Sequence, residues 1–265
     1  MSAALASRLI AGARKIVVKI GSNTLADSNG SINTAFLNEF AAQTAALTEQ
    51  GKQVVIVSSG AQIAGLWTLG SWARKKDIHY RQALCAVGQV ELMAAWRRAL
   101  SAYNLKTGQI LLTRDDFGDP VRALNMRNTL FTLVDEGIIP VINENDTVGV
   151  EEIKIGDNDN LAALSAILWS ANLLVLLSDI DGVYDKNPKE HPGAKLISEV
   201  HNINELKQKI SIGSANDFGT GGIATKIEAA EKVCAYGIPA FLAHGGRPNV
   251  LLALASGEQP CTVFV

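Results

Sequence analysis

Short, nearly uninterrupted apolar runs alternate along the chain with longer segments in which apolar residues recur at helical spacing. The runs are bounded by turn-forming residues and have lengths typical of strands, whereas the longer segments have one apolar side, as amphipathic helices do. The predicted strands are residues 15–20, 53–57, 109–112, 138–142, 173–177, 239–243 and 262–265. The predicted helices are residues 34–50, 81–103, 126–134, 161–168, 223–236 and 249–255.

The predicted strands are apolar at almost every position rather than at every second one. Strands buried on both faces have this pattern, and they alternate here with helices. We therefore predict an α/β fold: a three-layer sandwich with a mainly parallel central sheet between helices, in one domain over residues 1–265. Pro140 weakens strand 138–142 as an interior strand, because proline has no N–H to donate to a neighbouring strand.

Composition narrows the class of protein. The 265 residues are 48% hydrophobic and 19% charged with a net charge of −2, so we expect a globular protein that binds no nucleic acid. The three cysteines lie far apart, which argues against a disulfide framework and favours the cytoplasm. The longest apolar stretch contains polar residues and is too short for a membrane span, and the N-terminus lacks the apolar core of a secretory signal.

Polar, glycine-containing loops follow several of the predicted strands. Ligands of open α/β sheets bind beyond the carboxyl ends of the strands, where these loops lie. Any one of them is explained by an ordinary turn, but their number points to a ligand site at this edge. The loops are Gly21-Ser22-Asn23-Thr24, Ser58-Ser59-Gly60-Ala61, Asn143-Glu144-Asn145-Asp146-Thr147 and Ser178-Asp179-Ile180-Asp181-Gly182.

Two lysines are candidates for binding an anion. Lys19 interrupts an apolar strand near its end, so it either lies at an exposed strand end or directs its ammonium group over the sheet edge, where Gly21 leaves room for an anion. Lys226 follows the glycine-rich segment 218–222 at a predicted helix start, a place that favours phosphate, although an ordinary surface turn has the same composition. The spacing matches neither a Walker A loop nor a dinucleotide-binding signature.

Segment 143–160 is rich in acids, as a solvated hairpin or the cap of the next helix would be. Within it, Asp159 could orient two lysines or help to hold Mg²⁺, and Asp146 could pair with the ammonium group of a small substrate. The four histidines are scattered, and no nucleophile–base pair is evident. Lysines, glycine-rich loops and acids together suit phosphoryl transfer by positioning and charge neutralisation.

Taken together, these segments resemble the amino-acid kinase family, and within it the branch that phosphorylates the side-chain carboxylate of glutamate. The matches run in the family's order from about residue 15 onward. The Asn-Glu-Asn-Asp and Gly-Asp-Asn-Asp-Asn strings are far more specific than any glycine loop. The matching segments are 17–22, 57–61, Ala86-Val87-Gly88-Gln89, 111–114, 140–146, 155–161, 219–222 and Thr225-Lys226.

The resemblance implies transfer of the ATP γ-phosphoryl group to L-glutamate, with Mg²⁺, as the first step of proline biosynthesis. It assigns catalysis to Lys19, Lys226 and Asp159, with no metal-ligating residue, and the binding of glutamate to Ser59, Gly60, Asp146 and Asn158. Residues about 15–170 would bind the acceptor and about 171–265 the nucleotide. The nucleotide-binding residues would be Lys19, Gly21, Ser178, Asp179, Thr220, Gly221, Gly222, Ile223, Ala224, Thr225 and Lys226.

The resemblance also implies feedback inhibition by proline and a homo-oligomer. Many members of the branch carry a C-terminal PUA domain, which we do not expect in residues 1–265. Carbamate, aspartate, N-acetylglutamate and a nucleoside monophosphate stay open as alternative acceptors, as does a non-catalytic sensor of nucleotide or amino acid.

Overall fold

The computed structural model describes residues 2–70, 74, 76–149, 158–188, 190–210 and 222–265. The strands in this part of the chain are β1 (Lys15–Ile20), β2 (Gln53–Ser58), β3 (Lys106–Leu112), β4 (Ile138–Glu144), β5 (Leu173–Ser178), β6 (Val183–Tyr184), β7 (Leu196–Ile197), β8 (Glu199–Val200), β9 (Ala240–His244) and β10 (Cys261–Phe264). The helices are α1 (Ser2–Gly12), α2 (Ser22–Leu25), α3 (Thr34–Glu49), α4 (Ala61–Leu69), α5 (Ile78–Ser101), α6 (Arg114–Gly118), α7 (Pro120–Asp135), α9 (Asn158–Trp169), α10 (Ile203–Lys209), α11 (Ile223–Cys234) and α12 (Val250–Ser256).

An eight-stranded sheet with the order β3-β4-β2-β1-β5-β9-β10-β8 forms the middle layer. Neighbouring strands are parallel except β9 and β10, so the predicted mainly parallel sheet is confirmed. β1 lies between β2 and β5, and the sheet therefore joins the first half of the chain to the second at its centre. The short strands β6 and β7 form a separate antiparallel pair.

Pro140 lies in β4, which is an interior strand, against the expectation from its missing N–H. It is aligned with Gly108 of β3. On the other side of β4 the paired residues are Val141 and Ile142, which are aligned with β2. The proline is accommodated because this second ladder begins just after it.

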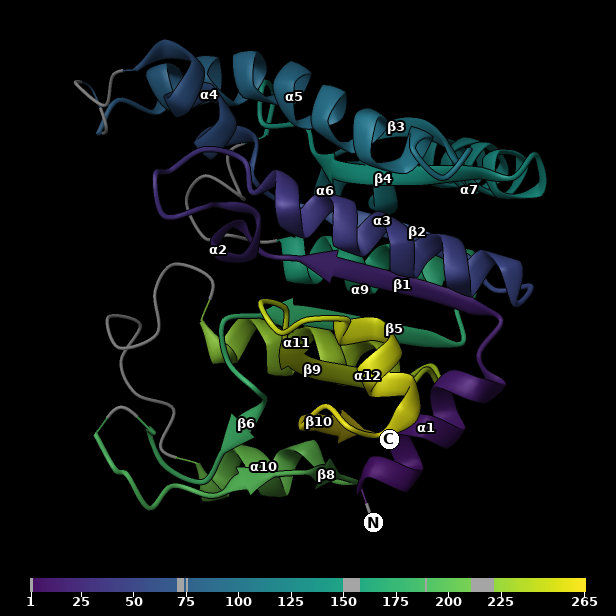
Figure 1. The fold of residues 1–265 in the computed structure, drawn as a ribbon, viewed down its shortest axis with the longest axis vertical. Helices are drawn as coiled ribbons and strands as arrows, with labels where there is room; N and C mark the ends of the chain where they lie inside the picture. The colour runs from purple at the N-terminus through teal and green to yellow at the C-terminus, as the bar shows by residue number, and fades with distance from the viewer. Residues whose placement is uncertain (1, 71–73, 75, 150–157, 189, 211–221) are drawn as a thin grey trace.

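Helices cover both faces of the sheet (Figure 1). One apolar cluster joins the sheet to α1, α3, α5 and α12, and the other joins it to α7, α9, α10 and α11. These two cores confirm the three-layer sandwich. Helices α1, α2, α4, α6 and α10 and the two-residue strands β6, β7 and β8 were not predicted from the sequence. Helices α2, α6 and α10 have seven residues or fewer, too few for a helical spacing to be recognised, and α4 is apolar on nearly every side.

The alternation of side chains along β1 determines where Lys19 points. Ile16, Val18 and Ile20 pack into the core under α3 and α5, whereas Val17 packs into the core on the α9 and α11 side. Successive side chains of a strand point to opposite faces. Lys19 therefore lies on the face that α9 and α11 cover, at the carboxyl end of the central strand.

Helices α4 and α5 pack backbone against backbone. A Cβ atom added at Gly65 would lie 1.8 Å from the carbonyl oxygen of Leu84, and one added at Gly88 would lie 1.8 Å from that of Ala61. No side chain larger than hydrogen fits at either position. The two glycines thus hold α4, and the Ser58–Ala61 turn before it, at a fixed place against α5.

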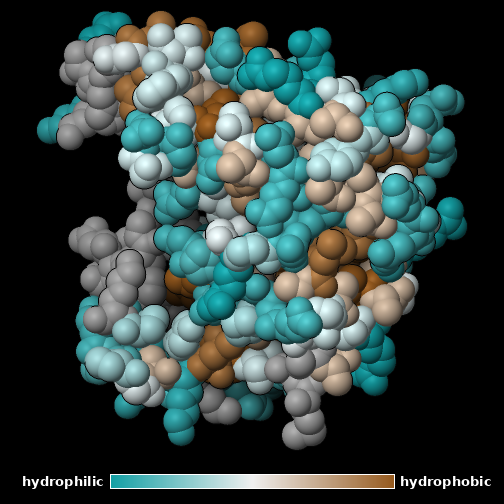
Figure 2. Space-filling view, in the orientation of Figure 1, coloured by the Kyte–Doolittle hydropathy of each residue, from teal (hydrophilic) through white to brown (hydrophobic). Residues whose placement is uncertain are grey.

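The outer surface of the helices is mostly hydrophilic, as expected for helices that pack their apolar sides on the sheet. Figure 2 shows the face over α1, α3, α5 and α12, where hydrophilic side chains prevail and apolar ones form several small groups, some of them at the α4 and α5 end. The large apolar side chains exposed at that end include Trp67, Leu69 and Val90. Among the described helices, none is long and apolar enough to cross a membrane. The three cysteines, Cys85, Cys234 and Cys261, are free thiols.

Candidate active site

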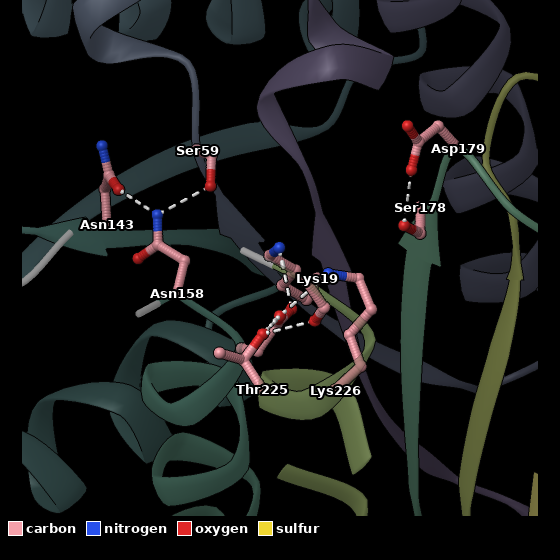
Figure 3. A network of polar contacts seen from close by, with 10 residues as sticks. Lys19, Ser59, Asn143, Asn158, Ser178, Asp179, Thr225 and Lys226 are labelled. Carbon is pink, nitrogen blue, oxygen red and sulfur yellow. Dashed lines mark hydrogen bonds and ion pairs between the residues drawn. The ribbon is translucent and has the colours of Figure 1, made fainter. Parts of the chain in front are cut away.

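Two lysines from distant parts of the chain meet at one carboxylate. Lys19 Nζ lies 2.8 Å from Asp159 Oδ1, and Lys226 Nζ lies 3.1 Å from Asp159 Oδ2. The aspartate is fully buried, and the two lysines are only 5% and 6% exposed. The predicted meeting of Lys19, Asp159 and Lys226 is therefore present in the structure, and Lys19 is not an exposed strand end (Figure 3).

Local structure explains why these side chains converge. Asp159 is in the first turn of α9, and Lys226 is in the first turn of α11. Thr225 holds the two helix starts together, since its hydroxyl donates to Asp159 Oδ2 at 2.8 Å and also lies 2.9 Å from the carbonyl oxygen of Gly222. Both helix N-termini add a positive potential at this edge of the sheet.

The charges of the cluster depend on one another. Burial by itself raises the pKa of Asp159, but the ammonium groups of Lys19 and Lys226 outweigh it and lower that pKa below its ordinary value. Burial lowers the pKa of Lys226, and Lys19 lowers it further, against the opposing effect of Asp159. Asp159 thus lies between two lysine side chains, and the Asp179 carboxylate also acts on Lys226. Two lysines directed at one edge of the sheet suit an anionic ligand.

A second polar cluster lies beside the first. The side-chain amide of Asn158 donates to Ser59 Oγ at 2.8 Å and to Asn143 Oδ1 at 3.0 Å. Asn143 Oδ1 also accepts from the backbone N–H of Glu144 at 2.9 Å. Asn158 directly precedes Asp159, so the first residues of α9 connect the cation cluster to this acceptor cluster of Ser59, Asn143 and Asn158.

The other two residues predicted to bind glutamate, Gly60 and Asp146, lie within three residues of Ser59 and Asn143 in the chain. Gly60 has a φ of +105°, a left-handed conformation that favours glycine, and it directly precedes α4. Asp146 is buried in the loop that follows β4 and is two residues beyond Glu144, the last residue of that strand. The backbone N–H of Ser59 donates to Ile20, which places the β2 loop against the end of β1.

The described residues among those predicted to bind the nucleotide come from two strand ends, those of β1 and β5, and from the start of helix α11. A Cβ atom at Gly21 would lie 3.7 Å from Lys19 Nζ, so the loop after β1 passes close to that ammonium group. Ser178 Oγ donates to Asp179 Oδ1 at 3.1 Å, and Asn23 donates to its other oxygen at 3.3 Å. Burial raises the pKa of Asp179, but hydrogen bonds from its own backbone, Ser178 and Asn23 lower it overall.

Only part of the predicted glycine-rich phosphate-binding segment lies within the residues that the structure describes. Thr220 and Gly221 lie outside the described residues, whereas Gly222 is the N-cap of α11. The side chain of Ile223 packs into the core on the α9 side, so only its backbone faces a ligand at the helix start. Ala224 and Thr225 follow in the first turn of α11.

Asn143 and Gln89 belong to segments that match the family, but the sequence analysis gave neither residue a role. Asn143 accepts from Asn158, and it donates through Nδ2 to Gln89 Oε1 at 2.8 Å. In the sequence, Asn143 is an amide side chain at the end of an apolar strand, and Gln89 is an amide side chain within an amphipathic helix. Neither signal indicates a partner, because the contact joins elements far apart in the chain.

The described residues do not form a resident metal site. Each oxygen of Asp159 already faces an ammonium group. Among the residues that the structure describes, no group of three or more His, Cys, Asp or Glu side chains could hold a metal ion.

The fold and the site define an α/β protein with a doubly covered, mainly parallel sheet and a cationic site at its strand ends. The chain belongs to the amino acid kinase family, whose model matches residues 14–244. A glutamate 5-kinase of Alkaliphilus metalliredigens is 62% identical over 256 residues, which cover 97% of each chain. One of Treponema pallidum is 44% identical over 289 residues, covering 97% of this chain and 98% of that relative.

A longer relative and two solved structures complete the comparison. A glutamate 5-kinase of Geobacter metallireducens is 46% identical over 252 residues, which are 95% of this chain and 68% of that relative. The crystal structure of UMP kinase from Ureaplasma parvum has a TM-score of 0.65 at 17% identity, covering 95% and 98% of the two chains. A structure of isopentenyl phosphate kinase has a TM-score of 0.62 at 19% identity, covering 95% and 100%. These likenesses confirm the amino-acid kinase fold.

Proposed function

We propose that this chain is a glutamate 5-kinase, which transfers the γ-phosphoryl group of ATP to the side-chain carboxylate of L-glutamate and forms γ-glutamyl phosphate and ADP. The observation that carries the proposal is the pair of buried lysines on Asp159, directly beside the cluster of Ser59 and Asn158. The glutamate 5-kinases that cover nearly the whole chain support it. Proline biosynthesis is the corresponding pathway.

The chemistry needs cations rather than a base. A carboxylate oxygen of glutamate forms a bond to the γ-phosphorus, while the bond from that phosphorus to the β–γ bridging oxygen breaks and its electron pair stays on ADP. The acceptor is already ionised at neutral pH, because the ordinary pKa of a glutamate carboxyl is about 4.3. No proton has to be removed, which agrees with a site built around Lys19, Lys226 and Asp159.

Within this proposal each charged residue has one task. Lys19 and Lys226 hold the phosphates and offset the negative charge that collects when two anions approach. Asp159 keeps the two ammonium groups together before the substrates bind. Mg²⁺ enters with ATP as part of the nucleotide substrate and adds positive charge at the phosphates.

The two substrates would bind on opposite sides of this cation cluster. Ser59, Gly60, Asp146 and Asn158 hold glutamate, and the Asp146 carboxylate suits its ammonium group. The loops after β1 and β5 and the start of α11 hold ATP. The acceptor part is then residues 15–170 and the nucleotide part residues 171–265, which meet where β1 pairs with β5.

The experiment is a hydroxylamine trap for acyl phosphate with ATP, Mg²⁺ and glutamate, alongside measurement of ADP. We expect γ-glutamyl hydroxamate in equal amount to ADP. Aspartate, N-acetylglutamate, carbamate and a nucleoside monophosphate serve as the acceptor panel. Activity with N-acetylglutamate but not glutamate would overturn the assignment, and a ligand-induced rise in Tm without any ADP would indicate a sensor.

Three further properties stay predictions of the family resemblance. We expect proline to inhibit the enzyme in competition with glutamate, which initial rates at varied proline concentration test. We expect a homo-oligomer, which light scattering coupled to gel filtration tests. We expect the protein in the cytoplasm, with its cysteines reduced, as the free thiols suggest.

A further inference from the structure

One face of α5 carries three side chains that hydrogen-bond the loops of the acceptor site. Gln82, Gln89 and Trp96 are spaced seven residues apart. Seven residues are close to two turns of about 3.6 residues, so the three side chains form one stripe along the helix. The stripe contains Gln89, the one polar residue of the Ala86–Gln89 motif, to which the proposed function gives no role.

Gln82 attaches the loop that carries Asp146. Its Nε2 lies 3.0 Å from the carbonyl oxygen of Asp146, 3.5 Å from that of Thr147 and 3.4 Å from that of Gly149. One amide group has two protons, so the contact to Asp146 is the strong one and the others share the second proton. The backbone of loop 145–149 is therefore gathered around a single side chain of α5.

Gln89 fixes the amide of Asn143. Its Oε1 accepts from Asn143 Nδ2, which leaves Asn143 Oδ1 directed toward Asn158 Nδ2. The Nε2 atom of Gln89 is sealed from solvent and has no hydrogen-bond partner among the described residues. Gln89 thus serves as an acceptor here, and it holds the nitrogen end of the Asn143 amide, while the backbone N–H of Glu144 and the side chain of Asn158 hold its oxygen.

Trp96 and the glycine contact hold the other acceptor loop on the same helix. Trp96 Nε1 donates to Ser58 Oγ at 2.9 Å, inside the core. Gly88 lies against Ala61 so closely that no Cβ fits between them. Both loops of the acceptor site are therefore positioned by α5, although they come from different strands.

We propose that Gln82 and Gln89 are positioning residues that set the affinity for the acceptor amino acid, by holding loop 145–149 and the Asn143–Asn158 pair in the binding geometry. The assignment rests on the proposed function, because the acceptor is taken to be glutamate. Neither residue contacts the cation cluster through any described bond, so their effect falls on acceptor binding and not on the ATP side.

The test compares Gln82→Met and Gln89→Met with the wild type by initial-rate kinetics. Methionine keeps the unbranched stem and the helix propensity but neither donates nor accepts comparably. We expect the KM for glutamate to rise about tenfold, corresponding to about 1.4 kcal/mol of binding. We expect kcat at saturating glutamate and the KM for ATP to stay within about threefold.

Gln43→Met is the matched control. Gln43 is a buried glutamine of α3 whose Oε1 accepts from the backbone N–H of Leu251 at 2.8 Å, away from both acceptor loops. We expect this variant to lower Tm and leave the KM for glutamate unchanged. If Gln82→Met and Gln89→Met behave like it, with lower Tm and unchanged KM, their role is structural and the assignment is wrong.

The activity of the wild type distinguishes a failure of the proposed function from a failure of the roles assigned to Gln82 and Gln89. A wild-type protein that forms no γ-glutamyl hydroxamate would overturn the proposed function and this assignment with it. An active wild type whose KM for glutamate is unchanged in both variants would overturn the assignment alone. A rise in the KM for ATP equal to that for glutamate would show general damage to the site and would also contradict it.

Discussion

Lys19 and Lys226 share a single buried counter-ion, each facing a different oxygen of Asp159. One carboxylate contacts both lysines, and Asp179 adds a weaker attraction to Lys226, in a place nearly sealed from water. Positive charge held there is costly unless anions meet it. The cluster is thus prepared for phosphate before any ligand arrives.

Loss of the Lys226 ammonium group tests its part in transfer. We expect Lys226→Met to lower kcat by two or more powers of ten, because the variant loses one contact to the developing charge, worth about 2.7–4 kcal/mol. Circular dichroism should show an unchanged fold, since Lys19 still pairs with Asp159. Lys207→Met is the control, because Lys207 forms a partly exposed ion pair with Glu231. A kcat near the wild-type value would contradict the assigned role.

Asp159→Asn tests the shared counter-ion. The variant leaves two buried ammonium groups without their carboxylate, and we expect the free energy of unfolding to fall by about 3–5 kcal/mol. An added anion should replace part of the lost charge, so sulfate should raise Tm more in the variant than in the wild type. Thermal melts in sulfate and in chloride of equal ionic strength measure this. Equal shifts in both proteins would show that Asp159 does not neutralise the lysines.

The pKa of Asp159 determines how the cluster responds to acid. Burial opposes ionisation, but Lys19 and Lys226 lower the pKa below its ordinary 3.8. The carboxylate is then charged more readily in the folded than in the unfolded state. Its stabilisation is fully present above the ordinary pKa and is lost as pH falls through the lowered one. Acid denaturation of the wild type should show this loss, and Asp159→Asn should lack it.

Activity should fall on the alkaline side as Lys226 loses its proton. Burial lowers the pKa of Lys226 below the ordinary 10.5, Asp159 opposes this, and Lys19 adds to the lowering. We expect the alkaline limb of kcat against pH to have its midpoint below 10.5 in the wild type. Removing the Asp159 charge should move that limb to lower pH. An alkaline limb that is the same in Asp159→Asn would exclude Lys226 as the titrating group.

Gly88→Ala tests the close contact of α4 and α5. The new methyl carbon would lie 1.8 Å from the carbonyl oxygen of Ala61, so the helices must separate. We expect a loss of about 1–3 kcal/mol of stability and a higher KM for glutamate, since α4 follows directly from Gly60. Gly118→Ala in α6 is the control, because no atom lies within 4 Å of its added Cβ. Chemical unfolding of both variants measures the difference.

Much of the fold was predictable because its signals are local. The runs at β1, β2 and β5 are apolar at nearly every position, and this pattern alone indicates burial on both faces. Pro140 argued against an interior position for β4, also on local grounds. A missing N–H matters only toward a strand with which that residue would pair, and the ladder between β4 and β2 begins one residue later, at Val141. A local rule cannot show where a ladder begins.

The residues of the site and the role of Asp159 between two lysines were predictable, whereas the contacts that support the acceptor loops were not. Lys19 was conspicuous as a charge within an apolar strand, and the acid-rich segment contained Asp159. Gln82 was not conspicuous, because a glutamine in a helix is ordinary and its partners are carbonyl groups of a loop far along the chain. Only the packing of α5 beside that loop gives the residue a role.

The sequence by itself determined the alternation of the main strands with helices, the burial of the sheet on both faces and the polar loops at the strand ends. Each follows from side chains that are close together in the chain. The tertiary structure alone decided that Lys19 and Lys226 each face a different oxygen of a buried Asp159 and that α5 supports both acceptor loops. Those contacts depend on which elements pack together, a choice made by the free energy of the whole core and not by any one segment.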